Sequence, residues 1–235
     1  MKKLLTILIS IILLLNCSKT PTSPDNQNLN LKTSKVFIVN QGIWGGANGT
    51  LSIYDVDNDT LYNNVIELGN VANFITIYKN KAYVLNSTSN NIMVLDISEK
   101  QITIEKTISG FNNPWSATIL NEKLYVANQT GDKVSVVDLN QLSVIKEIPV
   151  GTAPQGIYTI KDKVYVANTG YEGWGKPYLP GKISIIYKDN IIKEITAGIN
   201  PQAFSSDSEE NLYVCLLYTS PSPRDLSTSR MPSSA

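Results

Sequence analysis

Three tryptophans stand in polar, glycine-rich stretches and are the side chains best suited to contact a ligand. Trp44 is followed by two glycines, Trp174 lies between two glycines, and Trp115 follows a proline. Such indole rings are not readily buried in a sheet, and rings held on loops stack on sugars, flat cofactors or aromatic ligands. Tyr171 and Tyr178 lie near Trp174. The pattern predicts an aromatic binding surface; the alternative is that each indole packs on its own segment or on a neighbouring loop.

Groups for acid, base or metal chemistry are scarce. The chain has no histidine, a side chain widely used for proton transfer and zinc binding. Its carboxylates are not clustered at metal-ligand spacing, and Glu209 and Glu210 are typical of a solvated turn. No glycine-rich phosphate loop joins a strand to a helix. We therefore expect no catalytic residue, no metal and no cofactor. Because 20 basic residues balance 20 acidic ones, we also expect no nucleic-acid partner.

An internal repeat supplies the elements that position these residues. A short apolar segment with an aromatic second residue and a final Asn recurs along the chain, at intervals of about 40 to 48 residues. The recurring aromatic residues are Phe37, Tyr83, Tyr125, Tyr165 and Tyr213. The segments between them are rich in β-branched residues and alternate in polarity. This pattern is typical of a propeller blade of four short strands, and it predicts that the recurring tyrosines pack between blades.

Each unit repeats the same order of strands. The aromatic segment is followed by a turn, by an apolar strand that ends in Asp in three units, by a further strand, and by a Gly/Asn turn that usually holds Pro. These Asp residues, like the Asn residues that end the aromatic segments, are typical of turns. The apolar strands are Leu51 to Asp55, Ile92 to Asp96, Val134 to Asp138 and Ile183 to Tyr187, the last with Tyr in place of Asp. The sequence therefore predicts an all-β fold, a β-propeller of four-stranded antiparallel blades.

Three segments resemble a known family. The residues from Val164 to Asn168, from Val134 to Asp138 and from Ile148 to Pro154 are similar to those of the YVTN-repeat, or YncE-like, β-propellers. The resemblance runs from Val36 to Val214. It implies about seven blades in a complete protein, so a chain with about four blades and the start of another is expected to be truncated. The first unit is expected to lack its inner strand.

The predicted architecture places the candidate residues on one face. Because strand direction alternates, the loop between the second and third strands of a blade shares a face with the connection to the next blade. Two such loops are expanded, residues 41–50 with Trp44 and residues 169–182 with Trp174, and Trp115 is expected in a blade-joining loop. Gln155 and Gln202 follow blade-joining prolines. They are expected either to point at the axial mouth or only to stabilise turns.

The N-terminus has the pattern of a secreted lipoprotein. Two lysines precede an apolar run from Leu4 to Leu15 that is too short to span a bilayer permanently, and the segment before Cys17 resembles a bacterial lipobox. We predict a signal peptide over residues 1–16, lipidation at Cys17 and a flexible tether over residues 17–34. An ordinary signal peptide is the alternative. The lipid implies a membrane partner and places the protein in the cell envelope, at the outer membrane, with the side left open.

The last segment differs in composition from the rest of the chain. Residues 215–235 contain the two arginines of the sequence, Arg224 and Arg230, and no Asn, which is abundant elsewhere. The segment resembles a translated sequencing adapter, which implies a non-native, disordered tail after a partial propeller over residues 35–214. A natural disordered Ser/Pro-rich tail is the alternative. With Cys17 lipidated and Cys215 in the tail, no structural disulfide is expected.

Together these features predict a non-enzymatic envelope lipoprotein that binds a ligand or partner through the tryptophan-bearing loops. The opening segment from Gln41 to Asp55 resembles that of propeller lipoproteins in nutrient capture, among them surface cobalamin binders. This resemblance implies a corrinoid as one ligand; a glycan or a protein is equally compatible. Two alternatives stay open: an envelope enzyme, a lyase or dehydrogenase, whose active site lies in missing C-terminal blades, and a structural or adhesive surface propeller.

Overall fold

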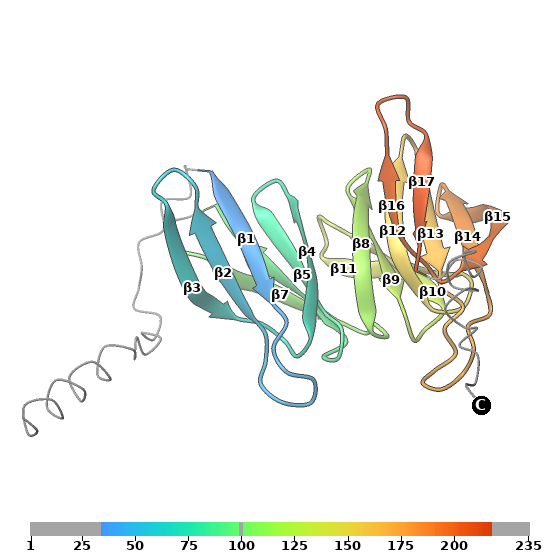
Figure 1. Ribbon diagram of the computed structural model, residues 1–235. Coiled ribbons are helices and arrows are strands. Elements are labelled where there is room, and N and C mark those ends of the chain that lie inside the picture. Colours follow the sequence, from blue (N-terminus) through green and yellow to red (C-terminus); the bar gives the residue numbers. More distant parts are fainter. Residues whose placement is uncertain (1–33, 99–100, 218–235) are drawn as a thin grey trace, which may run out of the picture.

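The computed structural model describes residues 34–98 and 101–217, and all regular structure in these ranges is β. The predicted all-β fold of antiparallel, four-stranded sheets is confirmed, and no helix occurs within these ranges. Neighbouring sheets follow one another in chain order across the molecule (Figure 1). The predicted signal peptide, Cys17, nearly all of the predicted tether and residues 218–235 lie outside the described residues.

Consecutive strands pair to form each sheet. The first sheet contains β1 (Lys35–Asn40), β2 (Thr50–Asp55) and β3 (Thr60–Glu67). The second contains β4 (Ala72–Tyr78), β5 (Lys81–Asn86), β6 (Asn91–Asp96) and β7 (Thr103–Ser109). The third contains β8 (Pro114–Leu120), β9 (Lys123–Asn128), β10 (Lys133–Asp138) and β11 (Ser143–Pro149). The fourth contains β12 (Pro154–Ile160), β13 (Lys163–Asn168), β14 (Pro180–Tyr187) and β15 (Asn190–Ile199). The fifth contains β16 (Pro201–Ser206) and β17 (Leu212–Leu216).

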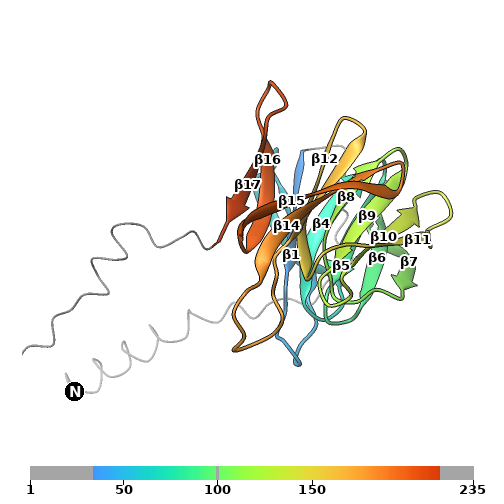
Figure 2. The same cartoon turned by 90° about the vertical axis from the view of Figure 1, so that its right-hand side faces the viewer.

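The first strands of successive sheets lie side by side. β4 contacts β8, β8 contacts β12, and β12 contacts β16; we call these four the inner strands. Figure 2 shows β4, β8 and β12 running through the middle of the molecule, with β7 and β11 at its margin. In the described residues the first sheet begins at β1, which contacts β4 but corresponds to the second strand of the other sheets. The expected lack of an inner strand in this sheet is thus met within residues 34–98.

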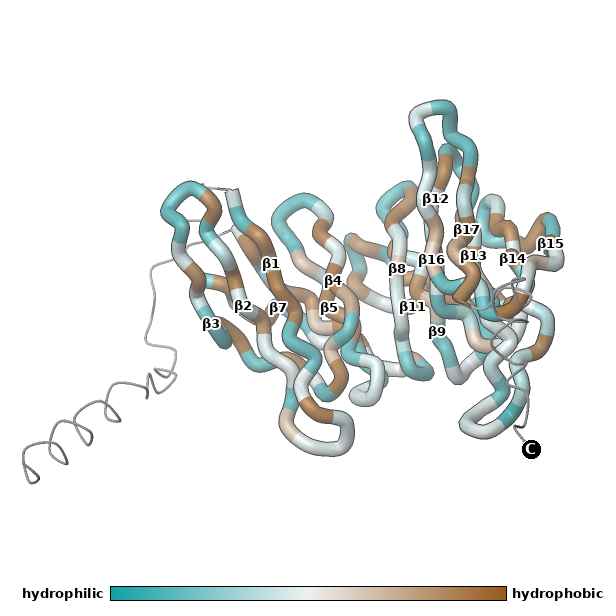
Figure 3. The backbone as a smooth tube through the Cα atoms, in the orientation of Figure 1, coloured by the Kyte–Doolittle hydropathy of each residue, from teal (hydrophilic) through white to brown (hydrophobic). Residues whose placement is uncertain are grey.

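The core lies between neighbouring sheets. The second and third strands, such as KLYVAN in β9 and KVSVVD in β10, are buried on both faces because a sheet packs on each side. Hydrophobic residues therefore fill the middle of the strands, whereas the turns are mostly hydrophilic (Figure 3). Tyr83 belongs to the cluster between the second and third sheets, and Tyr125 to the cluster between the third and fourth. The predicted packing of these two recurring tyrosines between sheets is confirmed.

The recurring Asn and Asp residues have the structural roles expected of them. The Asn128 side chain accepts a hydrogen bond from the Asn112 backbone N–H at 3.0 Å, and its amide donates to Ser135 Oγ at 2.9 Å. It thus ties the third sheet to the connection that precedes it. The Asp138 carboxylate accepts the backbone N–H groups of Asn140 and Gln141, each at 2.8 Å. This closes the turn after β10 in the manner of an Asx turn.

One predicted boundary is wrong. The disordered, non-native segment was expected to begin at residue 215, but β17 continues through Cys215 to Leu216 and pairs with β16. The physical reason is that Cys215, Leu216 and Leu217 are apolar and can extend the strand pattern. Leu216 also packs over Gly198, where a Cβ would collide with its side chain. Sequence composition changes here, but strand pairing depends on the shape and polarity of the residues alone.

Candidate ligand-binding face

One end of the sheets carries all three tryptophan segments. The β1–β2 and β13–β14 loops project from the lower end in Figure 1, where the connections between sheets also lie. Backbone hydrogen bonds join the two kinds of segment: the Gly49 N–H donates to the Gly69 carbonyl at 3.0 Å, and the Thr169 N–H donates to the Ala153 carbonyl at 3.1 Å. We call this end of the molecule the Trp face. The placement of Trp44 and Trp174 on loops at one end agrees with the prediction.

The β1–β2 loop holds its indole ring in solvent on an ordered scaffold. Trp44 is 77% exposed. The Ile43 and Ala47 backbones pair at 2.9 Å, and the Asn70 amide, from the connection to the second sheet, donates to carbonyls of the loop at 3.0 to 3.3 Å. Gly45 takes φ of +65° directly after the tryptophan, a conformation that favours glycine. The ring is therefore displayed by a loop whose conformation is fixed by hydrogen bonds.

The β13–β14 loop displays a second indole ring. Trp174 is 96% exposed between Gly173 and Gly175, whose φ angles of +132° and +77° turn the chain sharply on both sides. Tyr171 and Tyr178 form a tilted ring pair, with centroids 5.5 Å apart, within the same loop. The tyrosines therefore stabilise the loop, whereas the indole has no ring partner among residues 34–98 and 101–217.

The sequence predicted Trp115 in a connecting loop, but the structure places it in a strand. It is the second residue of the inner strand β8, it is half-buried, and the strand register shifts between Pro114 and Ser116. The prediction was wrong because Pro114 does not end the connection but starts the strand, where its missing N–H does no harm at the first position. Trp115 is thus the extra residue of a β-bulge, a feature that redirects a side chain near a sheet edge.

The same bulge recurs in every inner strand. Gln155 in β12 and Gln202 in β16 occupy the position of Trp115, with register shifts at the same place. Gln155 is 7% exposed, and Gln202 donates a hydrogen bond to the Asn200 side chain, as expected of a turn-stabilising role. Asn73 in β4 completes the set. Sequence reasoning missed Asn73 because Ala72 stands where the other inner strands begin with Pro.

Hydrogen bonds link the bulges of β4, β8 and β12 from one inner strand to the next. The Asn73 amide donates to the Trp115 carbonyl at 3.3 Å, and Ser116 Oγ donates to the Gln155 carbonyl. Ser87 Oγ lies 2.7 Å from Asn73 Oδ1 and 2.6 Å from the Pro114 carbonyl, two acceptors that share its single proton. The Trp face therefore carries a row of one aromatic and three amide side chains along the inner strands. The loops with the two exposed indoles belong to the first and fourth sheets, whereas the row runs from the second sheet to the fifth.

The chemistry that these residues can perform is recognition rather than proton transfer. The side chains of the Trp face offer aromatic surface and neutral amide groups, which stack on and hydrogen-bond to a ligand. Among residues 34–98 and 101–217, no three His, Cys, Asp or Glu side chains are grouped so as to hold a metal ion. Over the same residues, no helix has the length and hydropathy needed to cross a membrane.

Comparisons with known proteins identify the fold alone. No protein-family model matches the sequence, and no curated protein matches it. Hydrazine synthase of Kuenenia stuttgartiensis is similar in structure, with a TM-score of 0.60 and 16% identity over 83% of this chain and 56% of that one. A functionally unknown protein of Desulfotomaculum acetoxidans has a TM-score of 0.61 and 12% identity over 79% and 63%. The computationally designed protein Ika8 has a TM-score of 0.56 and 10% identity over 77% and 55%. The alignments thus cover 55 to 63% of the length of these structures, and the all-β fold is consistent with a propeller-like architecture.

Proposed function

We propose that this chain is part of a β-propeller lipoprotein of the cell envelope that binds a ligand or partner through the Trp face and catalyses no reaction. The observation that carries the proposal is the exposure of Trp44 and Trp174, at 77% and 96%, on loops held by hydrogen bonds at one end of the sheets. The β-propeller is favoured by the side-by-side inner strands and by the propeller-like folds among similar structures.

The energetics of the two indoles favour a role in binding. A buried tryptophan removes a large apolar area from water, so a chain that leaves two of them in solvent forgoes that stabilisation. The free energy of burying these two rings is gained when a ligand or partner covers them. Because glycine turns and the Asn70 amide hold the β1–β2 loop, little conformational entropy remains to be lost when Trp44 is covered. This preorganisation is expected of a recognition loop.

The chemistry of the face limits the ligand to one with both apolar faces and polar edges. Indole rings stack on apolar faces, and the amides of Asn73 and Gln202, which are half-buried, are matched to polar edges. A corrinoid, a glycan and a protein surface all meet this description. No observation specifically favours an enzyme or a purely adhesive role.

The position at which the chain enters the first sheet supports an orientation with the Trp face directed away from the membrane. Ser34 lies at the end of the sheets opposite the Trp face, where its N–H donates to Asp57 Oδ2 at 2.8 Å and its carbonyl accepts from the Val56 N–H at 3.0 Å. A lipid at Cys17 would therefore connect to this opposite end. A membrane-bound protein of this kind would have the Trp face free to meet a ligand.

The proposal is tested by measuring binding to the full chain, by calorimetry, with cyanocobalamin and with a panel of oligosaccharides. Trp44→Ala and Trp174→Ala are each expected to weaken binding about tenfold or more, since aromatic hot spots contribute ~2 kcal/mol. Leu61→Ala is the control, because Leu61 is 51% exposed on β3 near the opposite end. Unchanged affinity in both tryptophan variants, or equal losses in all three, would reject the Trp face as the binding site.

A further inference from the structure

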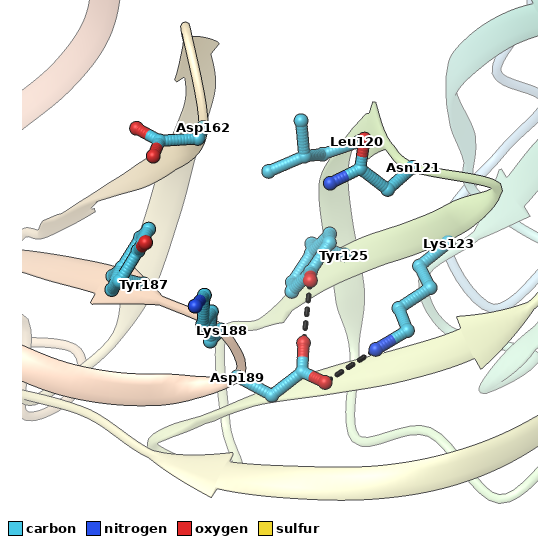
Figure 4. A pocket seen from close by; sticks show the side chains of 8 residues that line it. All are labelled: Leu120, Asn121, Lys123, Tyr125, Asp162, Tyr187, Lys188 and Asp189. Atoms are coloured by element: carbon cyan, nitrogen blue, oxygen red, sulfur yellow. Dashed lines mark hydrogen bonds and ion pairs between the residues drawn. The ribbon is translucent and has the colours of Figure 1, made fainter.

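A cavity of about 270 Å³ opens between the third and fourth sheets, at the end opposite the Trp face. Figure 4 shows Tyr125 and Lys123 of β9 on one side, Asp162, Tyr187 and Lys188 on the other, and Asp189 between them. The lining also includes Leu120 and Asn121 at the end of β8, so the residues come from the β8–β9, β12–β13 and β14–β15 turns and the adjoining strands. None of them belongs to the candidate residues of the Trp face.

The cavity exists because the fourth sheet departs from the repeat. At the interface between the second and third sheets, Leu139 and Leu142 from the β10–β11 turn are buried in the same core cluster as Tyr83. Tyr125 occupies the equivalent position of Tyr83 one sheet further on. The β14–β15 turn that should cover it consists of only Lys188 and Asp189, both with positive φ. Two apolar side chains are therefore replaced by two charged ones, and the space is not filled.

The interface between the first and second sheets also has an apolar cover from the connection between the third and fourth strands. Ile97 and Ile102, from the connection between β6 and β7, pack in the cluster that also contains Phe37. The apolar cover is thus present at the interfaces of the first three sheets and is missing between the third and fourth, where Tyr187 replaces the Asp that ends the equivalent strands. In the first three sheets, that Asp accepts backbone N–H groups of a longer turn. The fourth sheet lacks the Asp and has a shorter turn, and the shorter turn leaves the cavity open.

The polar groups of the cavity are held in a fixed arrangement. Asp189 accepts hydrogen bonds from Tyr125 Oη and Lys123 Nζ, which lie across the interface on the third sheet. Burial by itself raises the pKa of the Asp189 carboxyl, but the hydrogen bonds from Lys123 and Tyr125 outweigh it and keep the pKa below its usual value. Burial, and then the bond to Asp189, raise the pKa of Tyr125. The pair is therefore a carboxylate and a neutral phenol at neutral pH.

The charges around the cavity cancel. Lys123 and Lys188 contribute two positive charges, and Asp162 and Asp189 two negative ones. Lys188 Nζ also lies 5.2 Å from the centre of the Tyr187 ring, within the range of a cation–π interaction. A site with balanced charges, dense donors and acceptors and two aromatic rings is matched to a neutral ligand with apolar faces and many hydroxyl groups.

We propose that this cavity binds a neutral saccharide of one or two rings, independently of the Trp face. Its volume lies just below the ~300 Å³ at which drug-sized ligand pockets begin, which sets the small size. Hydroxyl groups of the sugar exchange hydrogen bonds with the carboxylates of Asp162 and Asp189 and with the ammonium groups. The C–H faces of the ring pack on Tyr187.

The test is a titration of the full, ¹⁵N-labelled chain with glucose, maltose and cellobiose, followed by amide chemical shifts. At least one sugar is expected to shift the amides of Asn121, Lys188 and Asp189. Tyr187→Asp, which restores the residue of the other sheets, is expected to weaken binding about tenfold by removing the ring. Asp189→Asn gives a second, nearly isosteric variant with the same expected loss, and circular dichroism checks that both variants keep the β fold.

Two controls separate this site from the surface and from the Trp face. Glu122→Gln removes a half-exposed charge from the adjacent β8–β9 turn, where Glu122 pairs with Lys79 outside the cavity, and should leave binding unchanged. Trp174→Ala should also leave it unchanged. Three outcomes would overturn the inference: no shift with any of the three sugars, binding that is lost in Trp174→Ala but kept in Tyr187→Asp, or tighter binding of glucose 6-phosphate than of glucose.

Discussion

Tyr83→Ala is expected to lower the free energy of unfolding by about 4 kcal/mol, the range for removal of a fully buried aromatic side chain. Tyr83 is 1% exposed and packs with Phe111, Leu139 and Leu142 between the second and third sheets. Burial is also the main reason why the pKa of its phenol is raised to about 12. Its removal leaves a void at an interface that both sheets need. Urea unfolding followed by circular dichroism measures the loss.

The repeat provides a matched control for this prediction. Tyr213 occupies the same position in the fifth sheet but is 57% exposed, so Tyr213→Ala should cost about 0.5 kcal/mol or less, as is usual for a surface substitution. Both variants lose the same atoms from the same kind of strand. Equal losses would mean that the phenol stabilises its own strand and that packing between sheets contributes little.

Asn128→Ala should destabilise the protein by about 3 kcal/mol. Asn128 is fully buried, and its loss leaves the backbone N–H of Asn112 and the hydroxyl of Ser135 without the bonds they make to it. Each buried polar group that loses its partner costs about 1–3 kcal/mol, and the void adds to this cost. The thermal or urea midpoint reports the change, and a loss below about 1 kcal/mol would show that water replaces the amide.

Asn40→Ala is the control for the second prediction. Asn40 holds the same repeat position in the first sheet, where it is half-buried and donates to Thr50 Oγ1 and Ser52 Oγ at 3.0 and 2.9 Å. Water can reach the groups that it leaves, so the expected loss is about 1 kcal/mol. The two residues share a donated bond to a Ser hydroxyl, and Asn128 in addition accepts the Asn112 N–H, so the difference between the variants reports burial together with that extra bond.

The strands could be predicted from the sequence because their signal is local and repeated. Alternating β-branched residues, the aromatic residue and the final Asn mark the second strand of each sheet, and β5, β9 and β13 end at the expected Asn. Alternation of strand direction then placed the loops of Trp44 and Trp174 on one face. These inferences need only neighbouring residues and a period, both of which are visible in a single chain.

The features that the sequence did not reveal depend on contacts between strands. The bulges at Asn73 and Trp115 arise from the register of β4 and β8 against their partners, which no residue type encodes alone. The cavity beside Tyr125 depends on the length of a turn in the next sheet. Its only trace in the sequence is Tyr187, an exception to a repeated Asp. A departure from a repeat was therefore a better guide to this site than the repeated residues.

The arrangement of the sheets in chain order has a consequence for local unfolding. Among residues 34–98 and 101–217, the first and fifth sheets each pack mainly on one neighbour, whereas the second, third and fourth pack on two. In native-state hydrogen exchange, β1 and β17 should therefore lose protection first, through opening events that never reach the middle, while the amides of β9 and β10 exchange only when the whole molecule unfolds. Within the described residues, local unfolding is thus expected to proceed from the first and fifth sheets toward the third.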